Sequence, residues 1–250
     1  FPEDDVVLTT GYNKITELLA QGTNIKLKSP VKKIDYKTDE ITVYTKDTKY
    51  QCDYVICSVS LGVLKASDIK FIPPLPDYMA NSIKNIGYGS VTKLAIKFDK
   101  QFWEDDVQYY YTATEQTGRW PVWLNYRTFS DKKILLGLCM GEYALKADLM
   151  TDDEILEDAL EVLKTVWEDD VGSIEKIVRT SWLTEPYFKG AYSFPSTKSS
   201  EEDFENISES LSEQIFFCGE HTNLQYLATT HGALLSGIRV AEEVIEANED

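Results

Sequence analysis

Apolar positions along this chain of 250 residues change from helical to strand-like spacing. Near the start, Ile15, Leu18 and Leu19 recur at helical spacing, which predicts a helix over residues 13–21. Asn13 is placed to cap this helix and Gly22 to end it. The pattern then predicts a β-meander that leads into one buried strand. Its β-rich runs cover residues 25–28, 31–36, 40–44 and 50–59.

The middle of the chain predicts a second sheet followed by a helix. Residues 77–86 have helical spacing and end at Gly87-Tyr88-Gly89, which indicates a hinge or boundary. Thr151 and Glu154 form a capping box at the start of a later helix. Between these helices, β-rich and aromatic runs occupy residues 91–98, 109–113, 120–126 and 134–140. The apolar stripe of the later helix consists of Ile155, Leu156, Ala159, Leu160, Leu163 and Trp167.

The end of the chain combines three features of a cofactor-binding corner. A strand-like run at residues 215–218 stops at Gly219-Glu220, and a loop leads from there to a helix that begins at Thr230. A glycine lets the backbone approach a ligand closely, and the N-terminus of a helix attracts anionic groups. The strand, the glycine and the helix together predict a site for a phosphate-bearing cofactor.

Several motifs occur in the order in which the flavin-dependent amine oxidases have them. The chain resembles this family, which includes polyamine oxidases, monoamine oxidases and flavin-dependent lysine demethylases, over essentially its whole length. The resemblance implies an α/β (α+β) fold in which a mixed-sheet substrate domain interrupts an FAD-binding domain. The motifs are Asp53-Tyr54-Val55-Ile56-Cys57-Ser58-Val59-Ser60-Leu61-Gly62-Val63-Leu64, Ile72-Pro73-Pro74-Leu75-Pro76, Thr92-Lys93, residues 182–193 and the C-terminal corner.

The resemblance also implies the domain boundaries. Residues 1–89 and 201–250 are expected to be two segments of the FAD-binding domain, and residues 90–200 the substrate-binding domain. Members of the family open with a G-x-G-x-x-G turn, which none of the 13 glycines forms here, and the first residue is Phe1. We therefore expect the C-terminal part of a longer enzyme. Its apolar surface would be covered by a missing N-terminal half or by self-association.

Lys93 is the first candidate for a catalytic role, because it stands in an otherwise apolar run. From the residues alone, a surface position in an alternating strand also explains this lysine. The resemblance implies instead that Lys93 holds a water against flavin N5. In that role a partly desolvated ammonium would order the water and stabilise negative charge.

Trp182, Tyr187 and Tyr192 form an aromatic cluster, which core packing would also explain. The resemblance implies that Trp182 and Tyr187 lie beside the flavin ring and that Tyr192 faces the substrate. Thr229 stands where many relatives have a second tyrosine, so it is expected to border both the flavin and the substrate. This departure widens the pocket and also occurs in the demethylase-like and spermine-oxidising branches.

The resemblance assigns further cofactor contacts. The backbone of Val31 is expected to meet the adenine. Gly219 and Glu220 are expected at the ribityl and pyrophosphate groups, where Glu220 would accept hydrogen bonds from flavin hydroxyls. Thr230 begins the helix that would point its N–H groups at flavin N1 and O2. Ala191 occupies the place where monoamine oxidases attach flavin through a cysteine, so FAD is expected to be bound non-covalently.

Composition narrows the range of partners. A net charge of −17 argues against direct contact with nucleic acid, which requires clustered Lys and Arg, and it suits a cationic amine. No apolar run approaches the roughly 20 residues that span a bilayer. With two histidines and no cysteine spacing suited to zinc, we expect no metal site and four reduced cysteines. We expect an intracellular location, either cytoplasmic or peroxisomal.

Three functions are consistent with the sequence. The preferred one is FAD-dependent oxidation of a small cationic amine, with polyamines favoured. It proceeds by hydride transfer to flavin N5, hydrolysis of the imine and release of hydrogen peroxide after reaction with oxygen. The second is a similar oxidation of methylated lysine side chains by a demethylase-like enzyme. The third is a non-catalytic fragment or interaction module that lacks the dinucleotide-binding half.

Overall fold

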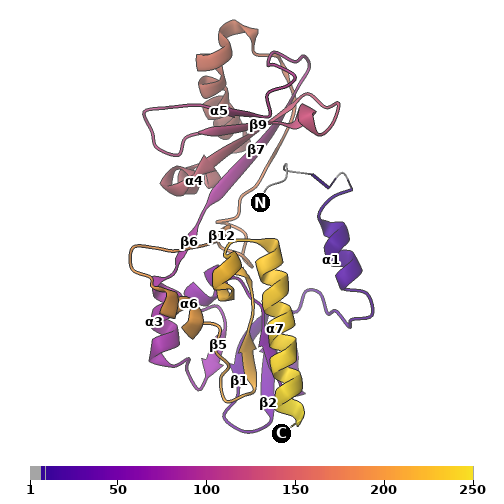
Figure 1. The fold of residues 1–250 in the computed structure, drawn as a ribbon, viewed down its shortest axis with the longest axis vertical. Coiled ribbons are helices and arrows are strands. Elements are labelled where there is room, and N and C mark those ends of the chain that lie inside the picture. The colour runs from indigo at the N-terminus through magenta and orange to yellow at the C-terminus, as the bar shows by residue number, and fades with distance from the viewer. Residues whose placement is uncertain (1–6, 9, 250) are drawn as a thin grey trace.

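Two large hydrophobic cores organise the part of the chain that the structure, a computed structural model, describes, namely residues 7, 8 and 10–249. The lower body in Figure 1 takes its core from residues before 89 and after 203, and the upper body takes its core from residues 94–177. The upper body is thus inserted into the sequence of the lower one. Residues 1–6 of the first predicted FAD-binding segment lie outside the described part.

A four-stranded sheet forms one part of the lower body. Strands β1 (Val31–Asp35), β2 (Ile41–Thr45) and β3 (Lys49–Cys52) are antiparallel neighbours, as the predicted meander requires. Strand β5 (Lys70–Ile72) joins β1 on its other side and runs parallel to it. A separate parallel pair joins β4 (Val55–Cys57) to β13 (Ile215–Phe217), two segments that lie far apart in the sequence.

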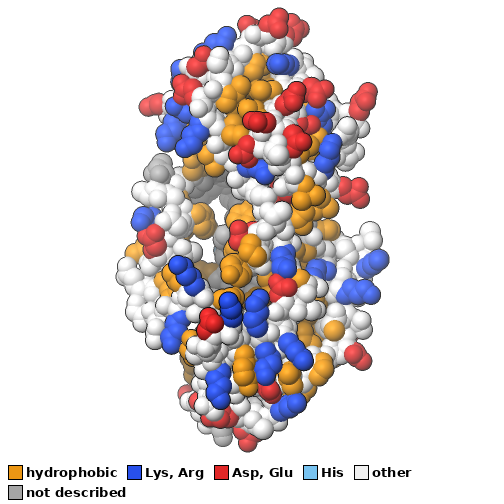
Figure 2. Space-filling model, turned by 180° about the vertical axis from the view of Figure 1, so that it is seen from behind, with side chains coloured by type: hydrophobic (Ala, Val, Ile, Leu, Met, Phe, Trp, Pro, Cys, Tyr) orange, Lys and Arg blue, Asp and Glu red, His pale blue; other side chains and the backbone are white. Residues whose placement is uncertain are grey.

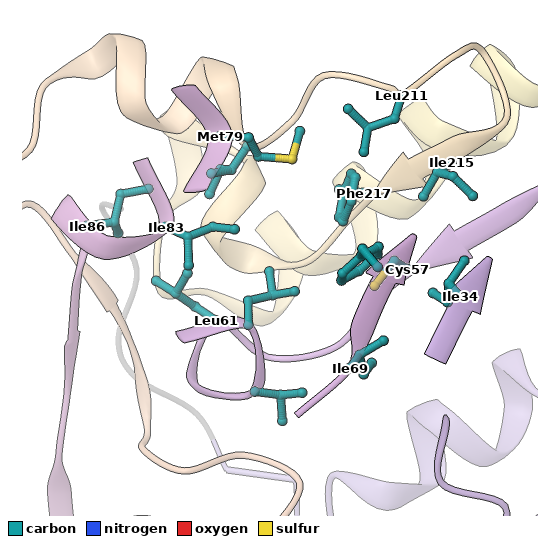
Figure 3. Packing of buried hydrophobic residues seen from close by; sticks show 14 of the residues in the cluster. Ile34, Cys57, Leu61, Ile69, Met79, Ile83, Ile86, Leu211, Ile215 and Phe217 are labelled. Atoms are coloured by element: carbon teal, nitrogen blue, oxygen red, sulfur yellow. The ribbon is translucent and has the colours of Figure 1, made fainter. Parts of the chain in front are cut away.

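Helices from both ends of the sequence enclose the core of the lower body. They are α2 (Leu61–Lys65), α3 (Asp77–Asn85), α6 (Glu201–Asn206) and α7 (Thr230–Glu249). Helix α3 buries Met79 and Ile83 because these residues lie four positions apart, on one face of the helix. Figure 3 shows Met79 and Ile83 converging with Leu61 of α2 and Phe217 of β13 on a shared interior.

The upper body is a five-stranded antiparallel sheet in the order β11-β7-β10-β9-β8. Leu94, Ile96 and Phe98, alternate residues of the interior strand β7, are buried, and α4 packs on β7 and β10. Ile155 of α5 belongs to the same core as Leu94 and Ile96 of β7. The strands are β7 (Val91–Phe98), β8 (Tyr109–Tyr111), β9 (Val122–Asn125), β10 (Ile134–Met140) and β11 (Ile174–Arg179), and the helices are α4 (Gly141–Asp148) and α5 (Asp152–Trp167).

A short ribbon connects the two bodies at the glycine-rich segment that the sequence predicted to be a hinge. Strand β6 (Gly87–Gly89) pairs antiparallel with β12 (Tyr192–Phe194). A Cβ atom on Gly87 would lie 2.5 Å from the ring of Phe194. Glycine therefore allows the two strands to pack closely there, and the predicted hinge or boundary forms a short strand.

The mixed α/β fold is confirmed, but several predicted elements were wrong in detail. Residues 25–28 form no strand, and the predicted strand at 50–59 divides into β3 and β4, which belong to different sheets. Asn13 does not cap the first helix, α1 (Asn13–Leu19). It is the first helical residue, and its side chain donates to Glu17 Oε1 at 2.7 Å. Helices α2 and α4 were missed.

Charge is unevenly distributed over the surface. Figure 2 shows Lys and Arg side chains gathered on one face of the lower body, although the chain carries a net charge of −17. The net charge is therefore an average that does not describe every face. Of the helices in the described part, none has the length and hydropathy needed to cross a membrane.

Candidate functional site

The aromatic segment 182–192 folds back onto the start of the upper sheet. The Ala191 amide donates to Gly89 O at 2.8 Å, directly beside the β6–β12 ribbon. The Gly190 amide donates to Trp182 O at 3.0 Å, which closes the segment into a loop. This loop joins strand β11 of the upper body to the ribbon. The predicted aromatic residues are thus held where the two bodies meet.

Lys93 lies at the same junction, near the start of β7. Its backbone is paired twice with Thr180: the Lys93 amide donates to Thr180 Oγ1 at 2.9 Å, and the Thr180 amide donates to Lys93 O at 3.0 Å. The side chain of Lys93 is exposed, as strand alternation alone would explain. The expected partial desolvation of its ammonium is therefore not present in the described residues by themselves.

The three predicted aromatic residues are not core residues. Trp182, Tyr187 and Tyr192 are 36%, 57% and 40% exposed, whereas buried Trp120 and Trp123 are 0% exposed. The ring of Trp182 meets that of Phe188 edge-on, with 5.3 Å between centroids. Within the described residues, core packing thus does not account for these rings, and their contact with a flavin stays a prediction. Exposed aromatic faces leave room for a flat ligand.

Tyr187 and Val31 line one cavity, although they are far apart in the sequence. The cavity has a volume of about 330 Å³, and Pro30, Val59 and Pro186 also border it. At its edge, Lys189 Nζ lies 2.9 Å from Asp68 Oδ2. The structure thus brings together two of the predicted cofactor-binding residues. The C-terminal corner contributes no residue to this cavity.

The corner itself requires a glycine. Gly219 has a φ of 141°, and a Cβ atom there would lie 2.5 Å from Cε1 of His221. The Gly219 amide donates to Ser236 Oγ of helix α7 at 2.8 Å. Glycine is needed here because the imidazole of His221 occupies the space that a side chain would take.

Glu220 is occupied by contacts within the protein. Its Oε1 accepts from the Ser193 amide at 3.1 Å, and its Oε2 accepts from Ser193 Oγ at 2.6 Å and from the Ala228 amide at 2.8 Å. A carboxylate offers about four acceptor sites, so most of this capacity is used. Glu220 therefore ties β12 to the loop before α7, a structural role that the sequence did not predict.

Thr229 and Thr230 both lie at the start of α7. Thr229 Oγ1 donates to Tyr226 O at 2.7 Å and accepts from the Gly232 amide at 2.9 Å, so Thr229 caps the helix. Thr230 is exposed, and its hydroxyl lies 2.7 Å from the Tyr12 hydroxyl. The hydroxyl of Thr229 is thus engaged by the backbone and does not point as a free polar group into a pocket.

His221 is buried behind this corner, with 2% of its surface exposed. Burial lowers the pKa of its imidazole to about 4, and the negative charge of Glu220 acts in the opposite direction. The ring is therefore neutral at pH 7. It packs against Gly219 as an uncharged filler of the corner.

A second cavity, which the sequence did not predict, is lined by Tyr192. It has a volume of about 360 Å³ and is bordered by Phe194, Met140 and Leu145. Leu145 went unnoticed because α4 was not predicted, and Met140, the last residue of the predicted strand 134–140, borders the cavity only because α4 follows it. The spacing of Ala144, Ala147 and Asp148, all buried, was the available signal for that helix.

The residues present fit a flat, phosphate-bearing cofactor. Exposed aromatic rings and a cavity lined by both Val31 and Tyr187 are features that such a ligand needs. The contacts of Lys93, Glu220 and Thr229 with such a ligand stay predictions.

Comparisons with known proteins give a consistent result. The model of the family "Flavin containing amine oxidoreductase" matches residues 1–245. Lysine-specific histone demethylase 1B of Mus musculus is 34% identical over 98% of this chain and 30% of its own length. Lysine-specific histone demethylase 2 of Homo sapiens is 33% identical over 98% of this chain and 31% of its own length.

A plant protein shows the same likeness. Lysine-specific histone demethylase 1 homolog 1 of Oryza sativa subsp. japonica is 32% identical over 98% of this chain and 29% of its own length. The chain thus spans about a third of the length of these relatives. All three are named as demethylases, so the preference for polyamines is not supported, and the second function fits better.

Proposed function

The chain belongs to the flavin containing amine oxidoreductase family, whose cofactor is FAD, and from this membership we propose that it forms part of an oxidase of N-methylated lysine side chains. The observation that carries the proposal is the similarity to lysine-specific histone demethylases over 98% of the chain. Because the chain spans about a third of those proteins, the activity is proposed for the protein as a whole.

The chemistry that FAD supplies when bound is the two-electron oxidation of the bond between the amine nitrogen and its methyl carbon. The residues of this chain would supply orientation and electrostatics. Trp182 and Tyr187 would flank the flat ring, which is bound without a covalent link because Ala191 offers no thiol. Tyr192 and Thr229 would border the side on which the amine approaches. The exposure of Tyr192 supports its part of this assignment, whereas that of Thr229 rests on the family resemblance alone.

Lys93 would hold a water molecule beside the reacting centre with its ammonium group. The backbone N–H and C=O groups of Lys93 are both hydrogen-bonded to Thr180. The pairing of β7 with β11 therefore sets the direction of the Lys93 side chain. The exposed ammonium would lose part of its hydration when substrate covers it. A positive group in a covered site stabilises developing negative charge.

A substrate comparison tests the proposal. The purified protein, loaded with FAD, is mixed without oxygen with a dimethyl-lysine peptide, the unmethylated peptide or spermine, and the visible absorbance of flavin is followed. We expect the methylated peptide alone to bleach the flavin, with release of formaldehyde as water hydrolyses the imine and of hydrogen peroxide once oxygen is admitted. Bleaching by spermine alone would support the polyamine function, and a protein that binds no flavin would support the non-catalytic one.

Lys93→Met provides a sharper version of this test, because Lys97 offers a matched control on the same strand. Both lysines are exposed on β7, and Lys97 Nζ lies 2.5 Å from Glu175 Oε2 on β11. We expect Lys93→Met to lower the rate of turnover by about 100-fold or more, as loss of a positioned proton-handling or electrostatic group does. Lys97→Met is expected to keep the wild-type rate. Equal rates for both variants would contradict the role of Lys93.

A further inference from the structure

Asp148, the last residue of α4, is buried under the junction of the two bodies. Its side chain and backbone are 2% exposed. Its carboxyl group accepts hydrogen bonds from two elements: Thr92 Oγ1 donates to Oδ1, Ser90 Oγ donates to Oδ2 at 3.3 Å, and the Leu183 amide donates to Oδ2 at 2.8 Å. In addition, Ser181 Oγ donates to its backbone oxygen at 3.1 Å.

These partners are uncharged, which sets Asp148 apart from an ordinary salt bridge. The nearby Arg179 directs its Nε to Asp152 Oδ1 at 3.0 Å and its Nη1 to Ala147 O at 3.3 Å. Within the described residues, no ion pair involves Asp148. Burying a carboxyl group costs free energy unless the group accepts hydrogen bonds. The Asp148 carboxyl group therefore keeps its donors in a fixed arrangement.

The donors belong to the two segments that carry the candidate site. Thr92 precedes Lys93, and since neighbouring residues of a strand point to opposite faces, a buried Thr92 directs Lys93 outward. Leu183 follows Trp182, so its amide fixes the backbone next to that ring. Asp148 therefore joins the two segments from the buried side, while Thr180 joins them at the surface.

We propose that Asp148 is a positioning residue that fixes Lys93 and Trp182 relative to each other through its hydrogen bonds to Thr92 and Leu183. The consequence for catalysis rests on the proposed function, whereas the geometric effect does not. The side-chain hydrogen bonds of Asp148 go to Ser90, Thr92 and Leu183, and none of them goes to Lys93 or Trp182 themselves. Asp148 acts through their immediate neighbours in the sequence.

Hydrogen exchange of single amides in the full chain tests the geometric effect. Asp148→Asn keeps the size of the side chain but replaces one acceptor by a donor, which faces the donors already present. We expect exchange at Leu183 and Lys93 to become about tenfold faster, because local opening becomes easier. Thr92→Val, which removes one donor only, is expected to cause a smaller increase, and it serves if Asp148→Asn does not fold.

Asp203→Asn is the matched control. Asp203 is also buried, at 8% exposure, and it accepts from the Ser200 amide at 2.8 Å and from Asn85 Nδ2 at 3.2 Å. These contacts lie in the lower body, so exchange at Leu183 and Lys93 is expected to stay unchanged. Unchanged exchange in Asp148→Asn and Thr92→Val, or an equal increase in the control, would overturn the proposal.

A double-mutant comparison tests the consequence for catalysis. If Asp148 acts through Lys93, the fold loss in turnover rate of the double variant Asp148→Asn, Lys93→Met is smaller than the product of the fold losses of the two single variants. Independent, multiplying losses would show a structural role only. A wild-type protein that oxidises no amine would refute the proposed function, and the exchange result would then decide the geometric proposal by itself.

Discussion

Single residues at the C-terminal corner combine structural roles with the predicted cofactor contacts. Gly219 lacks a side chain because His221 fills the space beside it, and Glu220 joins β12 to the loop before α7. The sequence indicated that these positions matter, since a glycine and an acid follow a buried strand. It did not reveal the partners of Glu220, because Ser193 and Ala228 meet it only in the folded chain.

The buried imidazole of His221 makes stability depend on pH. Its pKa is lowered from 6.5 to about 4 by burial, so the folded state favours the neutral form. As the pH falls below about 6.5, the unfolded chain takes up the proton first, and stability is lost until the folded pKa is reached. Between pH 7 and pH 5, we expect this residue to reduce the free energy of unfolding by about 2 kcal/mol.

Urea denaturation at both pH values measures this loss. His221→Gln is expected to show a smaller loss than the wild type, because glutamine does not titrate. His231→Gln, a change at the other, exposed histidine, is the control and is expected to retain the wild-type dependence. An identical pH dependence in all three proteins would contradict the assignment.

Whole elements were predictable where one local signal determined them. The capping box at Thr151 and the apolar stripe that follows it specified α5, and both hydrogen bonds of the box are present. Strands β1 and β2 followed from alternation. By contrast, α4 was missed, and the predicted 50–59 strand breaks between Cys52 and Val55, because pairing with β13 draws β4 into another sheet. Such tertiary pairing leaves no local pattern.

The capping box of α5 gives a prediction at the scale of an element. Thr151→Ala removes the acceptor of the Glu154 amide and is expected to lower the free energy of unfolding by about 1 kcal/mol. Thr165→Ala, in an exposed position of the same helix, is the control and is expected to change stability by less than about 0.5 kcal/mol. Thermal or urea unfolding of both variants decides. Equal effects would show that the cap does not contribute.

The two large cores of the described residues have no residue in common, and this separation is expected to appear in unfolding. Leu135 and Ile41 are fully buried, one in each core. Each change to alanine is expected to cost about 2–5 kcal/mol. In calorimetry, we expect two transitions, with Leu135→Ala shifting one and Ile41→Ala the other. One transition that moves with both variants would show that the cores unfold as a unit.

The arrangement of the bodies was predictable only with the family resemblance. Composition and periodicity indicate helices and two sheets, but nothing local shows that residues near 55 and 215 lie side by side. The candidate site could not be derived from local patterns either. Lys93, Trp182 and Tyr187 were identified from motif order, whereas Asp148, which links the segments that carry Lys93 and Trp182, becomes visible only in the hydrogen bonds of the folded chain.

The pairing of β4 with β13 also determines the order in which the two bodies can fold during synthesis. On the ribosome, β4 emerges before the whole upper body and its partner β13 only after it, so the lower body must wait with an open edge. The upper body has all its strands between these two and can close its core first. The inserted upper body is therefore the part that can fold first, and the unfinished lower body is the part that chaperones would have to protect.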